Sequence, residues 1–245
     1  LPQIEPISLR RVLEASPLGL IGSALSGVIA GAFLSLAPVF ARDSGFSDTG
    51  IALLMGMSIL GGFMLQWPIG HLSDRFDRRL VMMFVSFAVT GSSLAIIAAT
   101  GESDLLVIGF AILWGGLAFT LYPIAVSLVN DFMDSSQMLG ASAALLLVHG
   151  LGMIIGPLMA TQLMLLLGPN GLFWMLGATA LLLALFAWYR RQFGPPIPVG
   201  EPSTYRVVPR EGVYSGGLDP RYEEIQLELD FESEPVVIEE PEVEP

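Results

Sequence analysis

The sequence predicts an all-α membrane protein with six transmembrane helices, and three observations support this fold class. Of the 245 residues, 53% are hydrophobic and 14% are charged, whereas about a quarter of residues are charged in an average soluble domain. The charged residues are also unevenly placed, so that long stretches contain none. Each stretch can hold the roughly 20 apolar helical residues that cross a bilayer core. A soluble helical core would instead require polar outer faces on its helices.

The expected spans follow the charge-free stretches in chain order. The last such stretch, residues 135–189, is too long for one helix. The turn-forming segment Gly168-Pro169-Asn170-Gly171 divides it, because these residues end helices. The six expected spans are 17–40, 50–71, 80–100, 104–130, 138–167 and 171–189.

The basic residues predict the orientation of this bundle. All eleven are arginine, and only Arg42 flanks the spans on one side. Seven flank them on the other side: Arg10, Arg11, Arg75, Arg78, Arg79, Arg190 and Arg191. By the positive-inside rule, both termini lie in the cytoplasm (N-in/C-in), which also agrees with an even number of spans. We therefore expect a cytoplasmic lead-in at 1–16, a six-helix bundle at 17–191 and a multi-pass protein of the plasma or bacterial inner membrane.

Residues 192–245 are expected to form a disordered acidic cytoplasmic tail. The segment 194–245 holds 13 of the 23 acidic residues and shows no sustained apolar periodicity. It is either a solvated extension or a regulatory tail. The chain has no cysteine, so we expect no thiol-based metal site, and we expect no other metal, no bound cofactor and no nucleic acid partner. The expected partners are the lipid bilayer and a small-molecule substrate.

Small residues predict where the spans pack against one another. The first span carries small residues at helical spacing, among them Gly27 and Gly31, which permit close approach in lipid. Prolines predict kinks in four spans, because each lacks a backbone donor and clashes with the preceding turn. These prolines are Pro38, Pro68, Pro123 and Pro157.

A charged run between the second and third spans carries the clearest motif. The run Gly70–Arg79 reads GHLSDRFDRR. It resembles the signature loop of the major facilitator superfamily of secondary transporters. The matching residues are Gly70, Leu72, Ser73, Asp74, Arg75, Arg78 and Arg79. Asp77 stands where the superfamily pattern has a second glycine, so a turn there cannot rely on an unhindered positive φ.

The resemblance implies roles for the residues of this loop. Gly70 would permit close helix approach, and Asp74 would face the N-terminal end of the fifth span. Arg75 or Arg78 would pair with an acid, for which Asp131 at the end of the fourth span is the best candidate. Such a network would latch the cytoplasmic side in the outward-facing state. The alternative is an inert surface loop that only sets topology.

The same resemblance describes the chain as one half of a twelve-helix carrier. The non-methionine start and the basic lead-in favour the C-terminal half. An N-terminal six-helix half would then lie in the same longer chain, or a second copy would take its place. In the fifth span, Gly152, Gly156 and Pro157 are similar to a glycine–proline packing motif of the superfamily's antiporters.

Uncharged polar residues are the candidates for the translocation path, because the expected spans contain no Asp, Glu, Lys or Arg in their interiors. They are Gln66, Tyr122, His149 and Gln162. His149 is either a packed, hydrogen-bonded residue or a proton carrier. Coupling to a proton or another ion is open, and a coupling carboxylate is expected in the other half.

The expected function is transmembrane transport of a small solute by alternating access, as a uniporter, symporter or antiporter. A membrane scaffold or channel is an alternative, although no filter-like re-entrant segment is evident. An intramembrane protease is the remaining alternative. It would need a G-x-S-G nucleophile or paired intramembrane aspartates, and the sequence has neither, so we expect no enzymatic activity.

Overall fold

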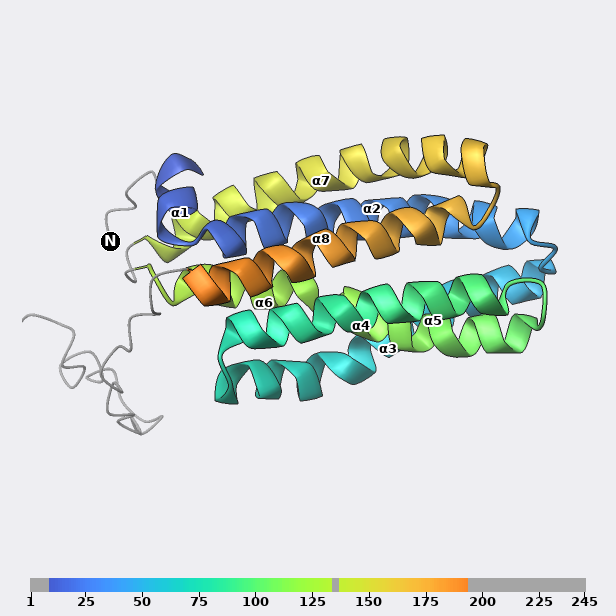
Figure 1. The fold of residues 1–245 in the computed structure, drawn as a ribbon, viewed down its shortest axis with the longest axis horizontal. Coiled ribbons are helices and arrows are strands. Elements are labelled where there is room, and N and C mark those ends of the chain that lie inside the picture. The colour runs from blue at the N-terminus through green and yellow to red at the C-terminus, as the bar shows by residue number, and fades with distance from the viewer. Residues whose placement is uncertain (1–8, 134–136, 194–245) are drawn as a thin grey trace, which may run out of the picture. The chain divides into compact units, whose positions relative to one another are not determined.

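The computed structural model describes residues 9–133 and 137–193. Within these ranges the chain forms helices joined by short turns, with no strand, so that the all-α fold class is confirmed (Figure 1). Six helical segments are long and apolar enough to cross a membrane, with α5 and α6 together making the fourth. The helices are α1 (Leu9–Ala15), α2 (Pro17–Asp43), α3 (Asp48–Arg75), α4 (Arg78–Ala99), α5 (Asp104–Ala118), α6 (Leu121–Asn130), α7 (Met138–Leu167) and α8 (Gly171–Phe193). The tail expected at 192–245 lies almost wholly outside the described residues.

The charged run is mostly helical, which corrects the expectation of a loop from Gly70 to Arg79. Helix α3 continues to Arg75, and only Phe76 and Asp77 separate it from α4. Asp77 has a φ of −53° and caps α4, because its carboxylate accepts a 2.8 Å hydrogen bond from the backbone N–H of Arg79. An aspartate in this position satisfies one of the free N–H groups of the first helical turn. The turn therefore needs no glycine.

The fourth span is broken, although a single helix was expected over 104–130. Helix α5 ends at Ala118 and α6 begins at Leu121. Pro123 has no N–H to donate to the carbonyl of Phe119, and its ring crowds that carbonyl. The expected effect of proline is thus realised at Pro123. The other three prolines, Pro38, Pro68 and Pro157, lie inside uninterrupted helices.

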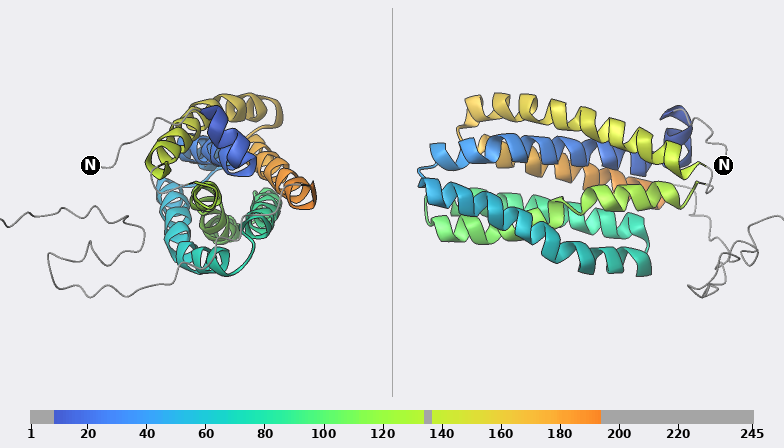
Figure 2. Two further views of the ribbon diagram at one scale, coloured as in Figure 1. Left: turned by 90° about the vertical axis from the view of Figure 1, so that its left-hand side faces the viewer. Right: turned by 180° about the vertical axis from the view of Figure 1, so that it is seen from behind.

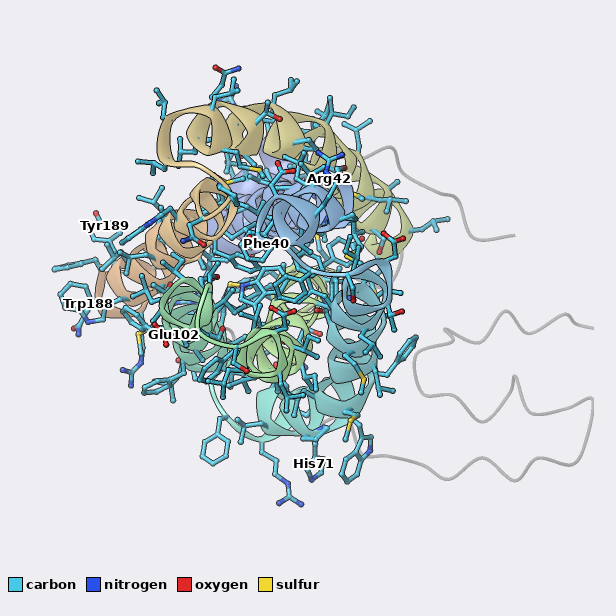
Figure 3. All side chains as sticks on the ribbon, turned by 90° about the vertical axis from the view of Figure 1, so that its right-hand side faces the viewer. Phe40, Arg42, His71, Glu102, Trp188 and Tyr189 are labelled. Carbon is cyan, nitrogen blue, oxygen red and sulfur yellow. The ribbon has the colours of Figure 1, made fainter. Side chains whose placement is uncertain are left out.

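The helices lie side by side in one bundle (Figure 2). They pack in pairs, and aromatic side chains fill the core between them. Helix α2 packs on α7, α4 packs on α8, and α3 packs on α5. The buried indole of Trp114 lies at the centre, 4.4 Å from the ring of Phe33 and 6.0 Å from that of Phe173. Its N–H donates to the hydroxyl of Ser93 at 2.9 Å, so that no buried donor is left unsatisfied there. In Figure 3, Phe40 points into this core, while Trp188, Tyr189 and His71 point away from the bundle.

Backbone-to-backbone contact between α2 and α7 depends on four glycines. A Cβ on Gly27 or Gly31 would meet the carbonyl oxygen of His149 or Met153 on α7. Conversely, a Cβ on Gly152 or Gly156 would meet a carbonyl oxygen of α2. The packing expected from the small residues of the first and fifth spans is therefore present, and it is reciprocal.

The two ends of the bundle differ in charge. Helix α1, the α3–α4 turn and the last turn of α8 lie at one end (Figure 1). This end carries the seven arginines that flank the spans on one side, and Arg42 lies at the other end. The two helices that are least covered are α3 and α7, with 22% and 17% of their apolar windows buried. The other four spans have at least 50% buried.

Candidate functional site

Arg78, the first residue of α4, joins three groups at the Arg-rich end. Its guanidinium donates to the carboxylate of Asp131 at 2.5 Å and to the backbone carbonyl of Ser127 at 2.8 Å. A third contact of 3.3 Å reaches the carboxylate of Asp74, across the α3–α4 turn. The side chains of Arg78 and Asp131 are only 22% and 26% exposed. The structure thus pairs Arg78, rather than Arg75, with the acid that the sequence suggested.

The electrostatics of a helix end explain this contact. The last carbonyls of a helix carry a partial negative charge and lack intrahelical partners. Arg78 supplies both a donor and a positive charge to the last turn of α6. Burial raises the pKa of the Asp131 carboxyl, and the guanidinium of Arg78 opposes this rise. A carboxylate at a helix C-terminus is unfavourable on its own, so Asp131 depends on Arg78 for its charge to be stabilised.

The exposed residues of the motif lie along the last turns of α3. The side chain of Asp74 is 68% exposed, and Leu72 and Arg75 are also exposed. The expected contact of Asp74 with the start of the fifth span falls near residues 134–136, outside the described residues. Among the described residues, a Cβ on Gly70 would meet no atom within 4 Å, so its role in close helix approach stays a prediction. Close approach between α3 and α5 occurs instead at Gly61, whose Cβ would meet the carbonyl of Ile112.

Arg79, the second residue of α4, contacts the end of α8. It is 7% exposed, lies 5.9 Å from the ring centroid of Phe132, and reaches the carbonyl oxygen of Arg190 at 3.5 Å. These contacts tie the start of α4 to the end of α8. The role of Arg79 in the motif stays a prediction.

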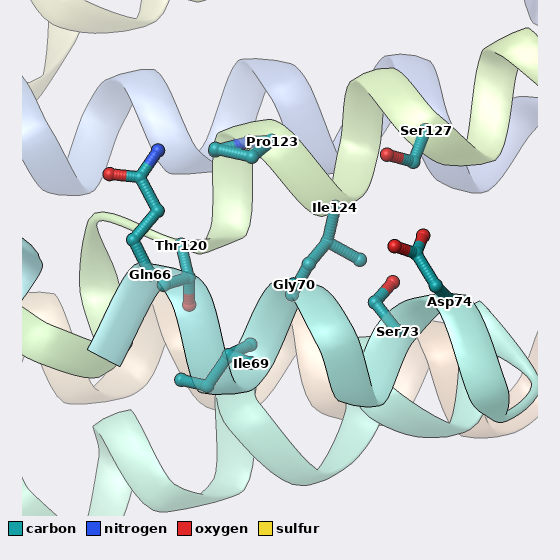
Figure 4. Close-up of a pocket in the computed structure, with 9 residues that line it drawn as sticks. All are labelled: Gln66, Ile69, Gly70, Ser73, Asp74, Thr120, Pro123, Ile124 and Ser127. Atoms are coloured by element: carbon teal, nitrogen blue, oxygen red, sulfur yellow. The ribbon is translucent and has the colours of Figure 1, made fainter. Parts of the chain in front are cut away.

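A cavity of about 160 Å³ lies beside the Arg78 network, between α3 and α6 (Figure 4). Ser73 and Asp74 line it from α3, and Ser127 lines it from α6. The hydroxyl of Ser73 is buried without a hydrogen-bond partner. Polar groups and this volume suit ordered water. Its other lining residues are Gln66, Ile69, Gly70, Thr120, Pro123 and Ile124.

A second polar cluster lies deeper in the bundle, where α2, α6 and α7 meet. The Nδ1 atom of His149 is 3.1 Å from the carbonyl oxygen of Ser23 and 3.2 Å from the hydroxyl of Ser26. The ring of Tyr122 lies 4.4 Å from the imidazole, centroid to centroid. The structure therefore brings two of the candidate path residues together. It adds Ser23 and Ser26, whose small size indicated only packing.

The other two candidate path residues lie apart from this cluster. Gln66 lines both the cavity beside Arg78 and a groove of about 260 Å³ that includes Leu34 and Phe119. Gln162 is exposed on α7, about 20 Å along the helix from His149 at 1.5 Å per residue. Within the described residues, no group of three or more His, Cys, Asp or Glu side chains could hold a metal ion.

Comparison with known proteins identifies the family of this chain. The sequence model of the Major Facilitator Superfamily matches residues 19–223. The chain belongs to the major facilitator superfamily. An uncharacterised MFS-type transporter of Enterobacter sp. (strain 638) is 32% identical over 187 residues, which cover 76% of this chain and 47% of the relative. The uncharacterised MFS-type transporter YcaD of Escherichia coli is 31% identical over 173 residues, covering 71% and 44%.

The extent of these matches bears on the architecture of this superfamily member. YcaD of Salmonella newport, 30% identical over 179 residues, matches over 73% of this chain and 46% of its own length. The chain thus spans about half the length of the relatives that it matches. Within it, the signature residues of the superfamily lie at the α3–α4 turn, and one of them, Arg78, contacts the last turn of the fourth span.

Proposed function

We propose that this chain is one six-helix half of a secondary transporter that moves a small solute across a cell membrane by alternating access. The Arg78 network carries the proposal, because it is a partly buried charged contact between helices at the position of the superfamily's signature loop. An inert topology loop would leave its charges in water. The membrane scaffold, the channel and the protease have no comparable feature in their favour.

A second six-helix half, in the same longer chain or as a second copy, would complete the carrier. The chain covers under half of the length of two relatives that it matches, namely 47% and 44%. Helices α3 and α7 also leave most of their apolar surface uncovered. On α3, Phe63 and Trp67 are 72% and 78% exposed. In the proposed carrier, α3 and α7 lie beside the second half.

The Arg-rich end is proposed to face the cytoplasm, in the plasma or bacterial inner membrane. Seven arginines flank the spans at this end, and only Arg42 lies at the other. A charge bias of this kind sets orientation through the positive-inside rule. The cavity beside Arg78 then opens toward the cytoplasmic side.

In this transporter, the Arg78 network would act as the latch of the cytoplasmic side. A hydrogen bond to a charged group contributes about 1.5–3 kcal/mol. Since 1.4 kcal/mol is a tenfold change in an equilibrium, losing one such contact would change the ratio of conformations by roughly ten- to a hundredfold. Asp131→Asn removes the charge but keeps the size of the side chain. It should therefore open the cytoplasmic side and slow the transport cycle.

Cysteine accessibility tests this proposal without a known substrate. In the full-length carrier, single cysteines replace Ser127, beside the Arg78 network, and Leu34, in the groove toward the opposite end. Asp131→Asn should increase the reactivity of the cysteine at 127 with a thiol reagent and decrease that of the cysteine at 34. Opposite changes are the signature of alternating access. Parallel changes, or none, would contradict the proposal.

The Arg10–Glu14 pair provides a matched control. It lies at the same end of the bundle, but its side chains are 86% and 64% exposed. Exposed i,i+4 pairs contribute only about 0.3–0.5 kcal/mol. Glu14→Gln should therefore leave both reactivities unchanged. An equal effect of Glu14→Gln and Asp131→Asn would mean that surface charge, rather than the buried contact, controls the conformation.

A further inference from the structure

His149 is held in one hydrogen-bonding arrangement by α2. The hydroxyl of Ser26 donates to the carbonyl oxygen of Ser23 at 2.8 Å, so its own hydrogen is already used. The hydroxyl oxygen of Ser26 and the carbonyl oxygen of Ser23 therefore both face Nδ1 of His149 as acceptors. A neutral imidazole has one donor nitrogen and one acceptor nitrogen. Nδ1 must then carry the hydrogen, and Nε2 carries the free lone pair.

This lone pair lies near the middle of the membrane. His149 is eleven residues from the start of α7, and Ser26 is nine residues from the start of α2. At 1.5 Å per residue these positions are about 14–17 Å from the Arg-rich end. Half of a hydrocarbon core is about 15 Å. Coupling-ion sites of secondary transporters lie at this depth, near the interface between repeats.

The surroundings of His149 separate it from an ordinary packed histidine. His149 and Tyr122 are both partly exposed on the face where α6 and α7 meet. A basic nitrogen that faced lipid would have no partner, and such groups are expensive in hydrocarbon. Helix α7 is also among the least covered helices of the bundle. This face is therefore best suited to line the path between the two halves, where water can reach Nε2.

No other group in the neighbourhood can take up a proton near neutral pH. The interiors of the described spans contain no Asp, Glu, Lys or Arg. Helix α2 presents Ser23 and Ser26 to the imidazole, and α6 presents Tyr122. The ordinary pKa of tyrosine is about 10, whereas that of histidine is about 6.5. Imidazole is thus the one side chain here that can exist in both charge states between pH 5 and 8.

We propose that His149 is a proton-binding site of the carrier, in which Nε2 takes a proton from water on one side of the membrane and releases it on the other. This inference rests on the proposed transport function. Nδ1 keeps its hydrogen throughout, so that the imidazole becomes an imidazolium and returns, with no other bond made or broken. The contacts with Ser23 and Ser26 hold the ring while Nε2 exchanges its proton. Transport would then be driven by a proton gradient.

The decisive variant is His149→Asn. The amide nitrogen of asparagine takes the place of Nδ1 and can still donate to Ser23 and Ser26, but it cannot bind a proton. In the full-length carrier, the ratio of the reactivities of cysteines at 127 and 34 should change between pH 5 and 8 in the wild type, since the intrinsic pH dependence of the thiol cancels in this ratio. His149→Asn should lose this pH response while the protein remains folded. A pH response that survives in His149→Asn would overturn the proposal.

His71 provides the control, because it is the only other histidine in the chain and is exposed at the Arg-rich end of α3. His71→Gln should leave the pH response unchanged. Nitrogen-15 NMR of histidine-labelled carrier in lipid nanodiscs gives a second measurement, in which the His149 signal is assigned by its absence from His149→Asn. At pH 8 the His149 signal should be that of the neutral Nδ1–H tautomer. It should change to that of imidazolium as the pH is lowered to 5. A His149 signal that stays neutral down to pH 5 would overturn the proposal, even if cysteine accessibility still changes in opposite directions at the two positions. If His149 titrates but cysteine accessibility does not change in this way, the transport function is contradicted instead.

Discussion

Two glycines on α7, only two residues apart, should respond in opposite ways to the same substitution. A Cβ on Gly152 would meet the carbonyl oxygen of Ala24, with the backbone nitrogen of Val28 at 2.9 Å. These are backbone atoms of α2, so no change of rotamer can make room and the two helices must separate. A Cβ on Gly150 would meet no atom within 4 Å. Comparing the stabilities of the two Gly→Ala variants therefore separates the effect of helix contact from the effect of glycine on helix propensity.

The magnitude follows from this comparison. Gly→Ala raises helix propensity by about 0.8–1 kcal/mol at either position, so this term cancels between the two variants. Overpacking of a close contact costs about 1–3 kcal/mol. We expect Gly152→Ala to be less stable than Gly150→Ala by that amount in reversible unfolding of the chain in mixed micelles. Equal stabilities would show that α2 and α7 are not in backbone contact in the membrane protein, and the arrangement of His149 against α2 would then lose its basis.

Two further predictions concern the cap of α4 and the orientation of the bundle. Asp77→Ala should reduce stability by about 1 kcal/mol through loss of an N-cap, whereas Ser103→Ala, at an N-cap without a side-chain hydrogen bond, should have little effect in the same unfolding assay. An equal loss of stability in the two variants would show that Asp77 does not stabilise α4 as its N-cap. Single cysteines at Ser47 and Glu102 should react with an impermeant thiol reagent from outside intact cells, and a cysteine at Phe76 should react only after permeabilisation. The reverse pattern would invert the orientation.

The positions of the six spans could be predicted from the sequence because every span must meet the same requirement in lipid. Every span must lack charge over about 20 residues, and charges therefore mark the ends. The pairing of Arg78 with Asp131 was also predictable, since both lie at span ends on the same side. The open surroundings of Gly70 were not predictable, and the prolines predicted kinks in four spans without indicating that a helix would break only beside Pro123. Both depend on how closely a neighbouring helix packs, and the sequence of one helix does not record that.

The two candidate sites lie at the two ends of α6. This short helix carries Asp131 at its C-terminal end and Tyr122 in its first turn, about 14 Å apart at 1.5 Å per residue. It is separated from α5 by the break at Phe119 and Thr120, whereas α5 itself is fixed to α3 by glycine contacts. Release of Asp131 by Arg78 would free the end of a rigid ten-residue helix that pivots at its other end. Tyr122 lies in the first turn, next to this pivot, and therefore moves least. The Arg-rich end of α6 can thus move while Tyr122 stays beside His149.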